Sequence, residues 1–159
     1  MNATPAITAL DLAAFNAAYA RAIDSDTLEA WPAFFTERCR YRITHAEAQA
    51  EGLPGGLVYA DSRAMLEDRI AALREANIFE PQRYRHILGW PHLLAADGDS
   101  AQAETPFAVV RTMHSGEQMV FASGVYIDRL VRGAGGLRLA ERLVVCDSRR
   151  TDTLLALPL

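Results

Sequence analysis

The sequence contains no lysine: all 16 basic residues are arginine, and 20 acidic residues give a formal net charge of −4. This acidic balance argues against nonspecific nucleic-acid binding, which requires a basic surface. No apolar run approaches the ~20 residues needed to span a bilayer. No basic residue precedes Arg21, so the charged start of a signal peptide is missing. The sequence therefore predicts one cytoplasmic domain over residues 1–159, without nucleic-acid or membrane partners.

Cysteine is scarce as well. Cys39 and Cys146 do not form a Cys-x-x-Cys pair, which favours a reducing compartment over a disulfide framework. On one strand, His86 and His92 would lie ~20 Å apart, too far to share an ion. The spacings typical of zinc and iron–sulfur sites are missing, and so are a Gly-x-Ser-x-Gly elbow and a glycine-rich phosphate loop. We expect no metal, cofactor or catalytic nucleophile in this chain.

The N-terminal third predicts helices over about residues 8–36. Thr8 and Asp11 form a capping-box pattern, and Asp26 with Glu29 marks a second helix start. Alternating apolar and polar residues then predict a short strand over 39–44, followed by a loop. A third helix is expected over 62–77, with Asn77 as its stop.

From residue 83 onward the pattern predicts strands over about 83–94, 102–114, 118–131 and 137–147, joined by short turns. Sequential strands with short connections indicate an antiparallel meander. The expected fold class is α+β, with three helices packed on a curved, mostly antiparallel sheet. An apolar tail over 151–159 completes the chain.

Acid–base catalysis is the enzymatic hypothesis with most support in the residues. Glu141 interrupts an apolar strand, and His86 lies among apolar neighbours. As a buried pair they would act as base and acid with shifted pKa values. The structural alternative, which we favour, pairs Glu141 with an arginine at a subunit contact and makes His86 a core or interface histidine.

Two further features indicate contacts with other subunits. Arg83 and Arg85 precede an apolar strand and are interpreted as a protein–protein contact, whereas Arg40 and Arg42 fit a solvated face. The nearly all-apolar tail must dock on its own domain or on a neighbouring subunit. The candidate interface residues are thus Arg83, Arg85, His86, Glu141, Leu154, Leu155, Leu157 and Leu159.

Several blocks resemble the small (beta) subunits of aromatic-ring-hydroxylating (Rieske) dioxygenases. They are Tyr-Arg-His-Ile-Leu-Gly at 84–89, Leu-Ala-Glu-Arg-Leu-Val-Val-Cys-Asp at 139–147, and residues 23–26, 31–36, 73–78 and 152–159. The resemblance implies a cone-like fold of the nuclear transport factor 2 type. It also implies a non-catalytic subunit in a complex of three alpha and three beta chains.

In that family the alpha chain holds the Rieske 2Fe-2S cluster and the mononuclear Fe(II), and a reductase delivers electrons from NAD(P)H. The implied reaction is dihydroxylation of an aromatic carboxylate to a cis-dihydrodiol, with terephthalate the expected substrate and salicylate or another benzoate-type ring the alternative. A stand-alone isomerase or dehydratase using Glu141 and His86 is the hypothesis from another class. A binding module without chemistry is a third.

Overall fold

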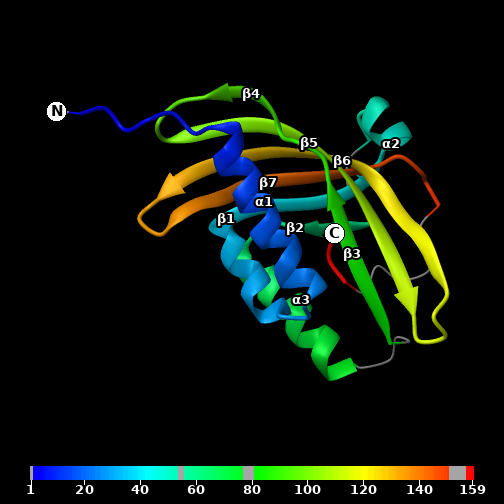
Figure 1. Cartoon of the computed structure of the whole chain (residues 1–159). Helices are drawn as coiled ribbons and strands as arrows, with labels where there is room; N and C mark the ends of the chain where they lie inside the picture. The colour runs from blue at the N-terminus through cyan, green and yellow to red at the C-terminus, as the bar shows by residue number, and fades with distance from the viewer. Residues whose placement is uncertain (1, 54–55, 77–80, 151–156) are drawn as a thin grey trace.

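The computed structural model describes residues 2–53, 56–76, 81–150 and 157–159. Two long helices pack on one face of a curved sheet: α1 (Ala9–Asp24) and α3 (Arg63–Ala76) (Figure 1). A 3₁₀-helix, η1 (Leu28–Phe34), and a short helix, α2 (Ala46–Ala50), complete the helical elements of the described residues. The α+β class expected from the sequence is confirmed.

Seven strands form the sheet, in the order β2-β1-β7-β6-β5-β3, with β4 also pairing with β5. Their bounds are β1 (Phe35–His45), β2 (Val58–Ala60), β3 (Gln82–Leu88), β4 (His92–Ala96), β5 (Ser100–Met113), β6 (Gln118–Gly133) and β7 (Gly136–Cys146). Strands β5, β6 and β7 form an antiparallel meander. The β1–β7 pair is parallel, and every other pairing is antiparallel.

The start of α1 follows the expected capping box. The Thr8 side chain accepts a hydrogen bond from the Asp11 backbone N–H at 3.1 Å, and the Asp11 carboxylate accepts one from the Thr8 N–H at 2.8 Å. These bonds satisfy two of the amides left open at a helix start. The backbone hydrogen bond from Thr8 is the main cause that lowers the pKa of Asp11.

Several boundaries differ from the sequence expectation. Asp26, expected to start a helix, has a φ of 60° in the turn between α1 and η1. Strand β1 begins at Phe35 rather than at residue 39, so the helical part ends earlier than expected. The loop expected after that strand contains α2 and β2. Strands β3 and β4 are two elements, because residues 89–91 between them are not in a strand. The Gly89 N–H still donates to the Pro106 carbonyl oxygen on β5.

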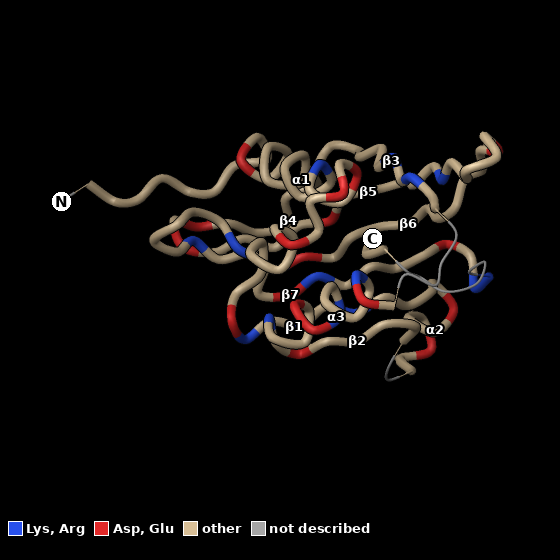
Figure 2. The backbone as a smooth tube through the Cα atoms, turned by 90° about the horizontal axis from the view of Figure 1, so that it is seen from below, with Lys and Arg blue, Asp and Glu red and all other residues tan. Residues whose placement is uncertain are grey.

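The core lies between the helices and the inner, concave face of the sheet. Its largest fully buried side chains include Trp31, Tyr19, Tyr41, Tyr126 and Phe35. Their rings meet edge to face, with centroids 5.2 Å apart for Trp31 and Tyr41. No helix of the described residues is long and apolar enough to cross a membrane. Figure 2 shows acidic and basic positions distributed over both helices and strands.

Candidate functional site

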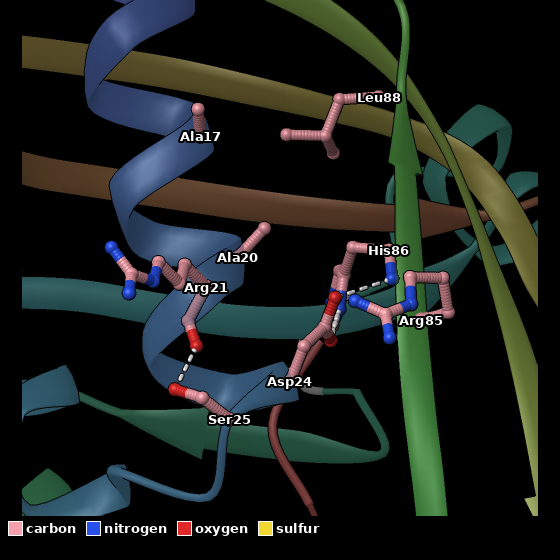
Figure 3. Close-up of a pocket in the computed structure, with 8 residues that line it drawn as sticks. All are labelled: Ala17, Ala20, Arg21, Asp24, Ser25, Arg85, His86 and Leu88. Carbon is pink, nitrogen blue, oxygen red and sulfur yellow. Dashed lines mark hydrogen bonds and ion pairs between the residues drawn. The ribbon is translucent and has the colours of Figure 1, made fainter.

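An aspartate–histidine pair joins α1 to the edge strand β3. The His86 imidazole Nδ1 lies 2.6 Å from one oxygen of Asp24, and the His86 backbone N–H donates to the other oxygen at 2.8 Å. The His86 side chain is fully buried and Asp24 is 8% exposed. Nε2 of His86 has no hydrogen-bond partner in the described part of the chain. The pair borders a shallow surface groove that Ala17, Ala20 and Leu88 also line (Figure 3).

Glu141 does not join this pair. The side chain of Arg142, the next residue on β7, is fully buried in the core, and successive side chains on a strand point to opposite faces. Glu141 therefore lies on the outer face, where it pairs with Arg40 at 3.8 Å. Strands β6 and β5 separate β7 from β3, which corresponds to ~14 Å between the two strands. The proposed acid–base pair of Glu141 and His86 is therefore not formed.

A β-bulge explains why the alternation in the sequence wrongly predicted a buried Glu141. Leu130 of β6 pairs with Leu139, whereas the preceding Arg129 pairs with Glu141, so β7 carries one extra residue at this point. The extra residue turns Glu141 to the face opposite Leu139, although the two are only two positions apart. A strict alternation would have put both on one face.

The polar centre of the core is Arg142, a residue that the alternation of the strand did not indicate. Its guanidinium donates to both oxygens of Asp128 at 2.8 Å and to the Asn16 side-chain oxygen at 2.6 Å. It also stacks between the rings of Tyr19 and Tyr126, 4.3 and 4.0 Å from their centres. Burial lowers the pKa of Arg142, but the charge and hydrogen bonds of Asp128, together with Tyr19 and Tyr126, outweigh burial and the net shift is upward.

The remaining interface candidates have different surroundings. Arg83 and Arg85 are exposed on the outer side of β3 and flank buried Tyr84. Leu157 and Leu159 are 8% and 0% exposed, so within this chain they belong to the core. The predicted contacts of Leu154 and Leu155 lie outside the described residues.

Metal-ligating side chains do not gather in the described residues: no group of three or more histidine, cysteine, aspartate or glutamate residues is placed to hold an ion there. Cys39 and Cys146 are both buried and unpaired with each other. Burial raises the pKa of the Cys146 thiol to about 11, which opposes formation of the thiolate that metals bind. A Rieske cluster or a mononuclear iron therefore does not fit the described residues.

Comparison with known proteins identifies the class first. The profile of the SnoaL-like domain matches residues 8–143. Terephthalate 1,2-dioxygenase, terminal oxygenase component subunit beta 1, from Comamonas sp is 58% identical over 153 residues, which cover 96% of this chain and 99% of that one. The anthranilate 1,2-dioxygenase small subunit of Burkholderia cepacia is 40% identical and covers 86% of this chain and 85% of its own length.

A solved structure agrees with these relatives. The crystal structure of a beta subunit ascribed to an aromatic-ring-hydroxylating dioxygenase of Novosphingobium aromaticivorans superposes with a TM-score of 0.86 at 37% identity. It covers 94% of this chain and 95% of the other. The chain therefore belongs to the family of beta subunits of aromatic-ring-hydroxylating dioxygenases, as the blocks in its sequence indicated.

Proposed function

We propose that this chain is the beta subunit of a terminal oxygenase that dihydroxylates terephthalate. The observation that carries the proposal is the 58% identity to a terephthalate 1,2-dioxygenase beta subunit over nearly the full length of both chains. The anthranilate relative, at 40%, favours an aromatic carboxylate of some kind even if the ring substituents differ. The product of such a reaction is a cis-dihydrodiol.

In this proposal the chain is a cytoplasmic scaffold without catalytic residues. The alpha subunit holds the Rieske 2Fe-2S cluster and the mononuclear Fe(II), and a reductase passes electrons from NAD(P)H to it. Three alpha and three beta chains form the complex, so that one cluster feeds the iron of a neighbouring alpha chain. The absence of a three-ligand group from the described residues is compatible with this division of labour.

Strand β3 offers a surface for the alpha subunit. The side chains of Arg83, Arg85 and Ile87 all lie on the outer face of this edge strand and alternate with buried residues. Ile87 is 57% exposed. Neither arginine forms an ion pair with another described residue, unlike Arg40, which pairs with Glu141. Exposed arginines beside an apolar side chain are typical of protein interfaces, where the guanidinium binds a partner carboxylate in a bidentate manner.

The experiment that tests assembly is co-expression of this chain with its alpha partner, followed by native mass spectrometry and an iron and acid-labile sulfide assay. We expect three heavy and three light chains, with iron and sulfide lost when this chain is isolated. The variant Arg83→Glu/Arg85→Glu should release this chain from the complex. The matched control Arg38→Glu/Arg150→Glu changes the charge equally at exposed positions outside β3. A chain that remains alone beside its alpha partner would refute the proposal.

The substrate is tested on the assembled oxygenase with its reductase. Oxygen consumption and diol formation should be fastest with terephthalate, compared with salicylate, anthranilate and benzoate. Preference for salicylate would assign the complex to the alternative substrate class. This chain alone should show no turnover of any of these acids.

A further inference from the structure

Residues 157–159 lie in the core between the helices and the concave face of the sheet, a region that we call the interior of the cone. Leu159 is fully buried, and its backbone oxygen accepts hydrogen bonds from the hydroxyl groups of Tyr19 at 2.8 Å and Tyr41 at 2.9 Å. Its backbone N–H donates to the Tyr41 oxygen at 3.1 Å. Tyr19 belongs to α1 and Tyr41 to β1. The backbone oxygen of Leu159 is thus bound by two buried side chains, 140 and 118 positions away in the sequence.

The surroundings of this group are rich in hydrogen-bond donors. Trp31 Nε1, Tyr126 OH and Arg142 Nη1 are buried, and none forms a hydrogen bond of full geometry in the described residues. The side chains of Trp31 and Arg142 nevertheless lie close enough to the Tyr19 hydroxyl to oppose the rise that burial causes in its pKa. The side chains that carry these donors touch the two tyrosines: Trp31 lies against Tyr41, and Arg142 over Tyr19. A buried donor without an acceptor is costly, so such a cluster suits a group with several acceptor lone pairs.

The walls around these donors are aromatic. Phe35 and Trp31 both contact Tyr41, with ring centroids 5.6 and 5.2 Å away. Burial raises the pKa of Tyr41 well above its usual value, so its hydroxyl keeps its proton and remains a donor over the physiological range. The Arg142 charge is balanced by Asp128, whereas the positive charge of Arg69 acts on Tyr41 and opposes the rise in its pKa. Donated hydrogen bonds and this positive charge both favour an acceptor oxygen at this position.

We propose that the interior of the cone is a binding site for an apolar group bearing a carboxylate or carbonyl, and that residues 157–159 occupy it as an intramolecular ligand. The site uses Tyr19 and Tyr41 to bind the acceptor oxygen and the aromatic rings to surround the apolar part. A carboxylate binds better than a carbonyl because charge-assisted hydrogen bonds are stronger and its extra lone pairs engage more donors. This site is independent of the subunit role proposed above.

The test uses Trp31 as a reporter in a Trp90→Phe background, because Trp90 is 65% exposed and is the only other tryptophan. In the full chain, acrylamide should barely quench Trp31 fluorescence. Deleting residues 157–159 should increase quenching several-fold, and acetyl-Leu-Pro-Leu should restore protection in a saturable manner. The amide of the same peptide should bind ~10-fold more weakly. The additional change Tyr19→Phe/Tyr41→Phe should abolish restoration.

A second probe, 4-methylpentanoate, distinguishes a small acid from a peptide. Protection by both acids supports a site for the carboxylate group itself, and protection by the tripeptide alone supports a site for a peptide segment. If neither acid protects Trp31 in a deletion variant whose circular dichroism is that of the full chain, the proposal is refuted.

A measurement on the full chain covers the case in which the deletion variant does not fold. Hydrogen exchange of the Leu159 amide should be slow, and Tyr41→Phe should accelerate it ~10-fold or more because the acceptor of that N–H is removed. Tyr59→Phe is the matched control, since Tyr59 is 48% exposed on β2. Rapid exchange of this amide in the unaltered chain would overturn the proposal.

Discussion

The carboxylate of Asp24 binds one residue twice: it accepts hydrogen bonds from the backbone N–H and from the imidazole of His86. Asp24 is the last residue of α1, and His86 lies in the middle of the edge strand β3. The backbone N–H that Asp24 covers is thereby unavailable to a foreign strand, which is the usual hazard of a sheet edge. The pair fixes the helix to the strand that bears the proposed interface arginines.

Replacing Asp24 with asparagine should therefore destabilise the chain. Asparagine keeps the shape of the side chain, but it replaces one of the two accepting carboxylate oxygens with an NH₂ group and removes the negative charge. We expect a loss of about 2–4 kcal/mol in the free energy of unfolding. Urea denaturation measures this loss. Asp68→Asn, at an exposed position of α3, should change stability little. Equal effects of the two substitutions would contradict the role assigned to Asp24.

The buried ion pair of Arg142 and Asp128 predicts a non-additive pair of substitutions. Arg142→Met should cost about 3–5 kcal/mol because it leaves the Asp128 charge buried without its partner. The double variant Arg142→Met/Asp128→Leu should recover most of this loss, since apolar pairs often replace buried ion pairs at little cost. A double-mutant cycle by thermal unfolding gives the coupling directly. Additive losses would show that the two side chains do not depend on each other.

Stability should decrease in alkaline solution. Burial raises the pKa of Cys146 to about 11 and also raises the pKa values of Tyr19, Tyr41 and Tyr126. The folded chain therefore retains protons that the unfolded chain releases, and its stability is complete below the unfolded pKa values and is lost as pH rises through the folded ones. For Cys146 the loss is on the order of 2–3 kcal/mol between roughly pH 9 and 11.

Urea denaturation at pH 8 and pH 10.5 checks this expectation, with tyrosinate absorbance recorded alongside. The buried tyrosines should ionise only as the chain unfolds. Cys146→Ala should reduce the pH dependence, because it removes one of the groups that retain a proton. Constant stability across this range would contradict the burial of these groups.

Gly124 should not tolerate alanine. A β-carbon at this position of β6 would overlap the backbone oxygen of Val145 on β7, so the two strands would have to separate. We expect Gly124→Ala to cost about 1–3 kcal/mol, the range typical of overpacking. At Gly133 on the same strand the nearest atom would lie 3.8 Å away, an ordinary contact. Gly133→Ala is therefore the matched control, and the two melting temperatures should differ clearly.

Local sequence patterns correctly predicted the structural features that are determined by residues close together in the sequence. The capping box of Thr8 and Asp11 spans three residues, and the meander of β5, β6 and β7 depends on short turns between alternating segments. The family resemblance was carried by contiguous blocks and is confirmed by the relatives. These features were readable because each is determined within a few residues or by one unbroken stretch of sequence.

The polar contacts of the interior were not readable in this way. Asp24 and His86 are 62 positions apart, and Tyr41 and Leu159 are 118 apart. The sequence showed only that charged residues interrupt an apolar strand. From this pattern we predicted that Glu141 is the buried one, whereas the structure buries its neighbour Arg142. Alternation could not choose between them because the bulge in β7 shifts the register by one residue.

The sequence by itself determined the α+β class, the family and the longer helices and strands, because hydrophobic periodicity and turn residues act locally. The short elements α2 and β2 lie where a loop was expected. Only the tertiary structure decided which polar side chains are buried and with which partners. A charged side chain is buried when another element provides a group of opposite charge, as Asp128 of β6 does for Arg142 of β7. Whether the two groups meet depends on helix packing and strand register, which are properties of the folded chain as a whole.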